Sequence, residues 1–178
     1  MIKTIVADPP WNETGGGRIK RGADRHYPLQ STAKNIETMA AWMDKEDLAD
    51  DLHFFLWVTN SFLPDGLRTL DALGFKYITN LCWAKDRFGL GYYFRGQHEL
   101  CLFATRGRGA GGKRPNNSIP GLIHARRRLH SQKPDEFYQL VERRSFGDYL
   151  DLFSRSGPRP GWTMKGNQLG HLQGGHHG

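Results

Sequence analysis

Short apolar runs alternate along this chain with amphipathic segments, which predicts strands alternating with helices. Ile2 to Ala7 is rich in β-branched residues and stops at Asp8-Pro9-Pro10, where proline cannot extend a sheet ladder. Residues 53–59 are apolar on both faces, as expected of a central strand that is covered on two sides. Three further strands are predicted at residues 77–84, 99–105 and 149–153.

Helices are predicted at residues 32–43, 63–73 and 134–144. Ser31 or Thr32 can cap the first, Gly74 ends the second, and Pro134 suits the first turn of the third. Residues 12–31 show neither the helical nor the strand periodicity of apolar residues and are predicted to form a surface loop. The alternation predicts an α/β fold with a mixed central sheet and helices on both faces.

Length and composition fit one globular domain. The chain has 178 residues, of which 38% are hydrophobic, enough to bury a core. We expect a single domain over residues 1–170 and a disordered Gly/His-rich tail at 171–178. No apolar run is long enough for a membrane helix, and the opening residues do not match a secretory leader, so a cytoplasmic protein without membrane association is expected. Cys82 and Cys101 are interpreted as core packing, and no metal site is expected.

Charge is segregated along the chain, whose formal net charge is +7. Residues 105–133 carry eight Lys or Arg and no acid, interspersed with Gly, Asn and Ser. This basic band suits a nucleic-acid backbone, where neutralised phosphates release counterions; a solubilising loop is the alternative. The acids between Glu37 and Asp51 are interpreted as a solvated helix face.

Asp8-Pro9-Pro10-Trp11 is the tetrapeptide with the clearest chemistry. The Asp8 carboxylate and the Pro9 carbonyl can accept the two hydrogens of an exocyclic amine, and Trp11 can stack on a flat base. The same aromatic surroundings tolerate a sulfonium cation. The alternative is that Asp-Pro-Pro is a strand-ending turn and Trp11 a core anchor.

The chain resembles the adenine-N6 methyltransferases of the messenger-RNA adenosine methyltransferase type, a family with bacterial and phage DNA-modifying members. The resemblance extends over nearly the whole chain. It rests on Ala7-Asp8-Pro9-Pro10-Trp11, Phe55-Leu56-Trp57-Val58-Thr59, Gly91-Tyr92-Tyr93-Phe94-Arg95, Glu99-Leu100-Cys101-Leu102, Lys133-Pro134-Asp135-Glu136-Phe137-Tyr138 and Gly161-Trp162 with Gly166-Asn167-Gln168.

This resemblance implies S-adenosylmethionine as methyl donor and a Rossmann-like methyltransferase fold, permuted so that the catalytic strand comes first and the cofactor strand last. It implies a catalytic role for Asp8, Pro9, Pro10 and Trp11. The cofactor-binding residues it implies are Asp8, Lys133, Asp151, Arg155, Asn167 and Gln168. The substrate-binding residues it implies are Tyr27, Glu99, Arg126, Arg127 and Arg128.

Nucleic acid is therefore the expected partner. DNA is the preferred substrate, because the compact single-domain form resembles the prokaryotic and phage members, and RNA is the alternative. A catalytically silent nucleic-acid-binding subunit is the second functional class, because members of such a family can be paired. A homodimer or a partner subunit is compatible with either class.

Overall fold

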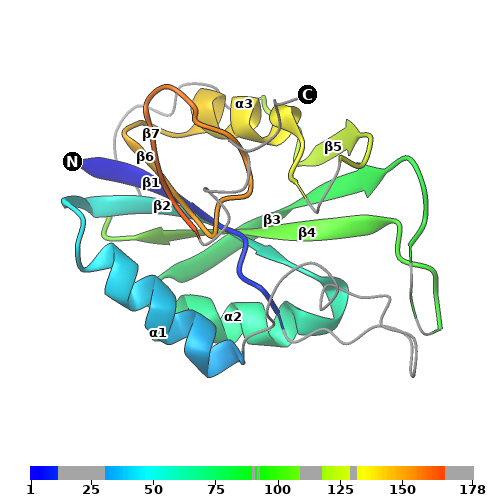
Figure 1. Ribbon diagram of the computed structural model, residues 1–178, viewed down its shortest axis with the longest axis horizontal. Coiled ribbons are helices and arrows are strands. Elements are labelled where there is room, and N and C mark those ends of the chain that lie inside the picture. Colours follow the sequence, from blue (N-terminus) through cyan, green and yellow to red (C-terminus); the bar gives the residue numbers. More distant parts are fainter. Residues whose placement is uncertain (12–30, 90, 92, 109–117, 129–131, 167–178) are drawn as a thin grey trace, which may run out of the picture.

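A seven-stranded mixed sheet with the strand order β5-β3-β4-β2-β1-β6-β7 runs through the molecule (Figure 1). The computed structural model describes residues 1–11, 31–89, 91, 93–108, 118–128 and 132–166. Strand β1 pairs in parallel with β2 and β6, and β7 continues this parallel half beyond β6. Strand β4 is antiparallel to both β2 and β3, which makes the sheet mixed, as predicted.

The elements occur in the following order along the chain. They are β1 (Ile2–Ala7), α1 (Thr32–Met43), β2 (Leu48–Val58), the 3-10 helix η2 (Asn60–Phe62), α2 (Leu63–Ala72), β3 (Lys76–Lys85), β4 (His98–Arg106), β5 (Leu122–Ala125), α3 (Asp135–Arg144), β6 (Tyr149–Leu152) and β7 (Trp162–Lys165).

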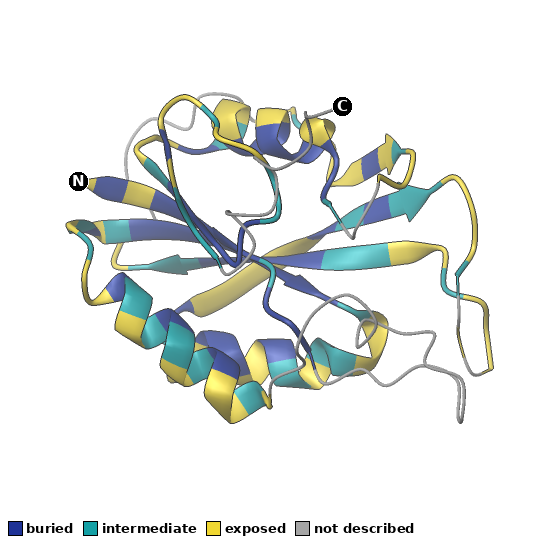
Figure 2. Cartoon of the chain, viewed as in Figure 1, coloured by how far each residue is buried: buried dark blue, intermediate teal, exposed yellow. Residues whose placement is uncertain are grey.

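Two apolar layers cover the sheet, one on each face. Along β2, Phe54 and Leu56 belong to the cluster beneath α1 and α2, while Phe55 and Trp57 belong to the cluster beneath α3. Side chains alternate between the two faces of a strand, so a strand covered on both sides needs an unbroken apolar run. Figure 2 shows the burial that results along the centre of the sheet.

The helix boundaries follow the predicted signals closely. The Ser31 side chain accepts a hydrogen bond from the Lys34 backbone N–H at 3.2 Å and caps α1. Gly74 follows α2 with a φ of 74°, a conformation that glycine adopts without steric cost. The helices lie on both faces of the sheet, as predicted (Figure 1). No helix within the described ranges is long and apolar enough to cross a membrane.

Three features differ from the predictions. Strand β2 begins at Leu48, so Asp50 and Asp51 lie on a strand and not on a helix face. Strand β5 lies inside the basic band, and β7 lies in a segment for which no strand was predicted. Both unpredicted strands have four residues, too few for a periodic pattern to show.

One edge of the sheet brings together segments that are distant in sequence. The carboxyl ends of the parallel strands β1, β2 and β6 meet at this edge. Because β4 is antiparallel to β2 and β3, its amino end, at His98 and Glu99, lies at the same edge as the carboxyl end of β3. Ligands of open α/β sheets bind beyond the carboxyl ends of parallel strands, so this edge is where a site is expected.

Candidate active site

Asp8 is the first residue after β1, and the backbone fixes it firmly. Its N–H donates to the Leu152 carbonyl of β6 at 3.2 Å. Pro9 and Pro10 are both buried, and the buried Asn35 side chain of α1 donates to the Pro10 carbonyl at 3.3 Å. The tetrapeptide is therefore held between the sheet and α1.

Trp11 lies in the apolar cluster beneath α1 and α2 and is 4% exposed. Its indole Nε1 donates to the Trp57 carbonyl of β2 at 3.0 Å, and its ring stacks on Phe62 with the centroids 5.9 Å apart. These contacts are those of a core anchor, the alternative role for this residue. The participation of Trp11 in base stacking stays a prediction.

Both carboxylate oxygens of Asp8 are paired with cations. Lys133 Nζ lies 3.3 Å from Oδ1, and the Arg155 guanidinium donates to Oδ2 at 2.9 Å and to the Asp8 carbonyl at 3.3 Å. The side chains of Asp8, Lys133 and Arg155 are only 15%, 7% and 9% exposed. Ion pairs that are largely shielded from water are much less screened by salt than surface pairs.

Glu99 extends these ion pairs across the sheet. One carboxylate oxygen accepts from Lys133 Nζ at 2.8 Å and the other from Lys85 Nζ at 2.7 Å. Burial alone would raise the pKa of Glu99, but the two lysines outweigh burial and lower it from 4.5 to about 2. Burial alone would likewise lower the pKa of Lys133, but Asp8 and Glu99 raise it to about 12. Both groups are therefore charged throughout the physiological range.

The result is one row of alternating charges along the site edge, which is the edge of the sheet where the carboxyl ends of β1, β2 and β6 meet. We call it the charge row, and its members are Lys85, Glu99, Lys133, Asp8 and Arg155. It carries three cations and two carboxylates. Lys133 Nζ also lies 4.8 Å from the Trp57 ring centroid, a cation-π geometry that helps to fix it.

Asp151 lies on β6, lines the same small pocket as Asp8 and Arg155, and is 1% exposed. The Tyr138 hydroxyl of α3 donates to its carboxylate at 3.0 Å. Burial is the main reason that the pKa of Asp151 rises from 3.8 to about 7. This carboxyl group therefore changes protonation near neutral pH.

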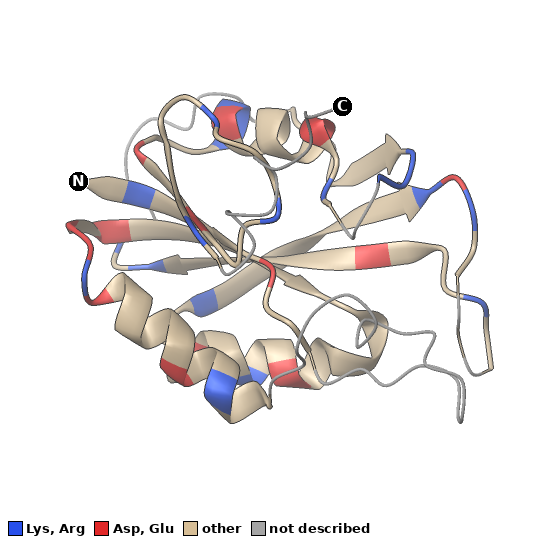
Figure 3. Cartoon of the chain, in the orientation of Figure 1, with Lys and Arg blue, Asp and Glu red and all other residues tan. Residues whose placement is uncertain are grey.

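A cleft of about 740 Å³ opens beside the Lys85 end of the charge row. Five cations and two carboxylates line it, together with Trp83 and Gln132. The charged residues are Lys85, Asp86, Arg87, Glu99, Arg126, Arg127 and Arg128. Figure 3 shows Lys and Arg near the end of β3 and between β5 and α3. Such an excess of positive charge suits a polyanion.

The structure brings most of the predicted site residues together. Asp8, Lys133, Arg155 and Asp151 lie at one end of the site edge, and Glu99 with Arg126 to Arg128 lines the cleft. Tyr27, Asn167 and Gln168 lie outside the described residues.

Sequence reasoning missed Lys85, Asp86, Arg87 and Tyr138 as site residues. The charges of residues 85–87 directly follow a predicted strand, which is the signal that could have identified them. The Arg127 N–H donates to the Asp86 carboxylate at 3.0 Å and joins this turn to the basic band.

The donor set fits S-adenosylmethionine, a zwitterion with a ribose and a sulfonium. Lys133 and Arg155 can bind a carboxylate, Asp8 an ammonium group, and Asp151 a ribose hydroxyl. An acidic residue on the strand at the ligand edge is a common ribose partner in nucleotide-binding α/β folds. The mixed seven-stranded sheet with helices on both faces is consistent with the fold of S-adenosylmethionine-dependent methyltransferases.

Comparison with known proteins defines the family. The MT-A70 family matches residues 2–168, so this chain belongs to it. The chain is 32% identical to an N(6)-adenosine-methyltransferase MT-A70-like protein of Drosophila melanogaster, over 93% of this chain and 26% of that protein. It is 30% identical to the N(6)-adenosine-methyltransferase catalytic subunit METTL3 of Homo sapiens, over 93% of this chain and 28% of that protein. The chain thus spans about a quarter of the length of these relatives.

Proposed function

We propose that this chain transfers a methyl group from S-adenosylmethionine to the exocyclic N6 amine of adenine in a nucleic acid. Family membership supports methyltransferase chemistry. The observation that carries the proposal is the placement of Asp8, which follows β1 directly and lies between Lys133 and Arg155 at 3.3 and 2.9 Å.

Three charged groups would hold the donor. Lys133 and Arg155 would bind its carboxylate, and Asp8 its ammonium group. Asp151, which lines the same small pocket, would accept a hydrogen bond from a ribose hydroxyl, and Asn167 and Gln168 would contact the ribose or the adenine edge. When bound, the donor supplies an electrophilic methyl group on a sulfonium.

The chain's own residues would orient the acceptor. The Asp8 carboxylate and the Pro9 carbonyl would each accept one hydrogen of the adenine amine, which aims the nitrogen lone pair at the methyl carbon. The new N–C bond would form as the S–C bond of the donor breaks, and the nitrogen would then lose a proton to water. Positioning supplies most of the catalysis, so no strong base is required.

The cleft is the proposed place of the nucleic-acid backbone. Arg126, Arg127 and Arg128 are all exposed on its wall, where each could neutralise a phosphate. DNA is the first candidate substrate. RNA is the second candidate, because the names of the relatives specify adenosine, the ribonucleoside.

Transfer of tritiated methyl from S-adenosylmethionine to polynucleotides tests the proposal. We expect incorporation as N6-methyladenine, its loss in Asp8→Asn, and its retention in Asp71→Asn, a matched change at an exposed carboxylate of α2. Parallel DNA and RNA strands of one sequence identify the substrate. Absence of incorporation into every polynucleotide would favour the catalytically silent subunit.

A further inference from the structure

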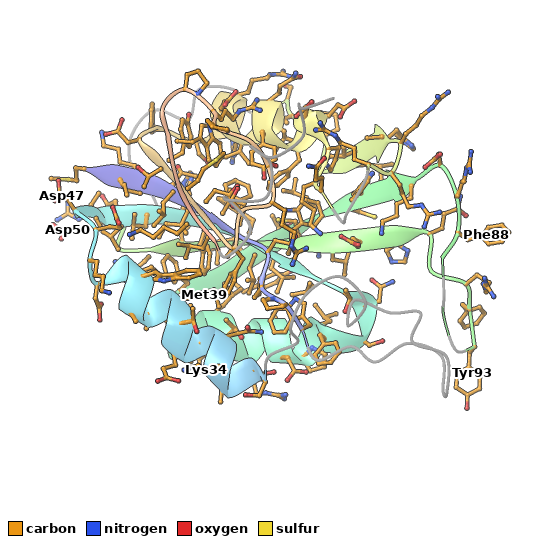
Figure 4. The ribbon with its side chains drawn as sticks, viewed as in Figure 1. Lys34, Met39, Asp47, Asp50, Phe88 and Tyr93 are labelled. Carbon is orange, nitrogen blue, oxygen red and sulfur yellow. The ribbon has the colours of Figure 1, made fainter. Side chains whose placement is uncertain are left out.

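Asn35 is a fully buried polar residue on the face of α1 that packs against the sheet. It is 0% exposed, and Met39 and Met43, which follow at intervals of four residues, belong to the apolar cluster on that face. Figure 4 shows Met39 on the side of α1 that faces the sheet and Lys34 on the outer side. Residues four apart lie on one face of a helix, so an apolar side chain is expected at the position of Asn35.

The hydrogen bonding of the Asn35 amide is incomplete. Its Nδ2 donates to the Pro10 carbonyl at 3.3 Å, and this assignment of the amide is required because a carbonyl only accepts. Its Oδ1 is buried and has no hydrogen-bond partner within the part of the chain that the structure describes. A buried acceptor without a partner costs stability. Departures of this kind from the pattern of a core concentrate at functional sites, and the contact that accompanies this one is the contact to Pro10.

The contact to Pro10 helps to fix the direction of the Pro9 carbonyl. The proline rings fix φ at residues 9 and 10, so only the ψ torsions of the two prolines remain soft. The carbonyls on either side are each held by a side chain, that of Asp8 by Arg155 at 3.3 Å and that of Pro10 by Asn35. With both neighbours held and both φ torsions fixed, the Pro9 carbonyl has little freedom to turn.

Asn35 itself lies on a fixed part of α1. Its N–H donates to the carbonyl of Ser31, the residue that caps the helix, at 2.9 Å. The Thr32 hydroxyl donates to the Asp65 carboxylate of α2 at 2.8 Å and joins the two helices. The first turn of α1 is therefore a rigid support from which the amide of Asn35 can hold Pro10.

We infer that Asn35 is a positioning residue for methyl transfer, which acts through the Pro10 carbonyl to direct the Pro9 carbonyl at the amine of adenine. Because Asn35 is fully buried, it would act on the reaction without touching either substrate. A misplacement of about 1 Å at a reacting centre can lower the rate about 100-fold. The inference rests on the proposed function and adds to it a residue of α1.

The test compares methyl transfer by the unchanged full chain with transfer by Asn35→Leu and by Asn35→Ala. Both substitutions remove the hydrogen-bond donor, but leucine keeps the branched shape of the side chain whereas alanine opens a cavity. The matched control is Met39→Leu, which changes a fully buried side chain on the same face of α1. Calorimetry with S-adenosylmethionine and urea unfolding accompany the kinetics of each protein.

We expect both Asn35 variants to lose about 10-fold or more in kcat. The Kd for S-adenosylmethionine and the KM for the polynucleotide should stay unchanged, because the cations proposed to bind the donor and the phosphates are all retained. The two variants should lose kcat alike although Asn35→Ala is the less stable, since a cavity lowers stability and the missing donor is common to both. Met39→Leu should retain the kcat of the unchanged protein.

An unchanged kcat in either Asn35 variant overturns the inference, and Asn35→Ala decides alone if Asn35→Leu does not fold. A loss of kcat that follows stability instead of the missing donor, or an equal loss in Met39→Leu, would assign the effect to the packing of α1 and also overturn it. Absence of transfer by the unchanged protein would refute the proposed function and the inference together. Transfer that the unchanged protein and both variants perform equally would overturn the inference alone.

Discussion

Replacing Glu99 by glutamine removes the carboxylate that lies between two lysines while keeping the shape of the side chain. Glu99 contacts Lys133 at 2.8 Å and Lys85 at 2.7 Å, and its side chain is 19% exposed. The pKa of Glu99 falls from 4.5 in the unfolded chain to about 2 in the folded one. At about 1.4 kcal/mol for each pKa unit, this difference corresponds to roughly 3 kcal/mol of stability.

The pH dependence has a definite sign. A lowered pKa means that the contribution of Glu99 is fully present above pH 4.5 and is lost as the pH falls toward about 2. Urea unfolding should therefore show Glu99→Gln to be less stable than the unchanged protein by roughly 3 kcal/mol at neutral pH. The two proteins should converge as the solution is acidified through this range.

The control for this experiment is Glu37→Gln, which removes an exposed pair with Lys34 on α1. Such a surface pair contributes only about 0.2 to 0.5 kcal/mol. A Glu99→Gln protein as stable as this control at neutral pH would show that the lysines do not stabilise the Glu99 carboxylate. A difference that persists at the acid end of the range would show that its cause is not ionisation.

Three further predictions concern ligands. Lys133→Met should weaken S-adenosylmethionine binding by about 10-fold or more, because methionine cannot donate a charge-assisted hydrogen bond to the donor's carboxylate; calorimetry that returns an unchanged Kd would remove Lys133 from the donor site. The affinity for S-adenosylmethionine should rise as the pH increases through about 7, the pKa of Asp151, because the ionised carboxylate is the better acceptor for a hydroxyl. Asp151→Asn should abolish this pH dependence. A pH dependence that survives the substitution would mean that another group causes it. Changing Arg126 to Arg128 to glutamine should flatten the salt dependence of polynucleotide binding, with the log–log slope falling by about 0.7 to 0.9 for each phosphate that the protein no longer neutralises; an unaltered slope would place these arginines outside the interface.

The sequence predicted the central part of the fold because that part has long apolar runs and distinct boundary residues. Asp8-Pro9-Pro10 marks the end of β1, and the run around Phe55 marks a strand covered on both faces. The two strands that were not predicted have one physical cause: β5 and β7 have only four residues each, and pairing with β3 and β6 is what makes them strands. Local propensity carries little information about such pairing.

The charge row could be predicted only in part, because strand register determines it. Glu99 lies opposite Trp83 in the β3–β4 ladder, so Lys85 reaches its carboxylate from two residues further along. Shifting this register by one residue would send Glu99 to the other face of the sheet. The sequence contains both residues but not the register, which the packed core of the whole sheet selects.

The geometry of the charge row suggests how two ligands could meet at one residue. Four of its members come from strands in their order across the sheet, Lys85 from β3, Glu99 from β4, Asp8 from the end of β1 and Arg155 from the segment after β6, while Lys133 precedes α3. Lys85 lines the cleft, and Arg155 lines the small pocket that Asp151 and Tyr138 also line. A polyanion would approach from the Lys85 side and a zwitterionic donor from the Arg155 side. Asp8 is paired with Lys133 and Arg155. The ammonium group of a bound donor would take the place of one of these two cations. Lys133 is also paired with Glu99 at 2.8 Å. Lys133 would therefore stay charged and in place when the Asp8 carboxylate exchanges a cation for the ammonium group of the donor. Asp8, the carboxylate that would exchange its partner, is therefore the one proposed to orient the amine. Glu99, the carboxylate that keeps both its lysines, is the one that holds the site together.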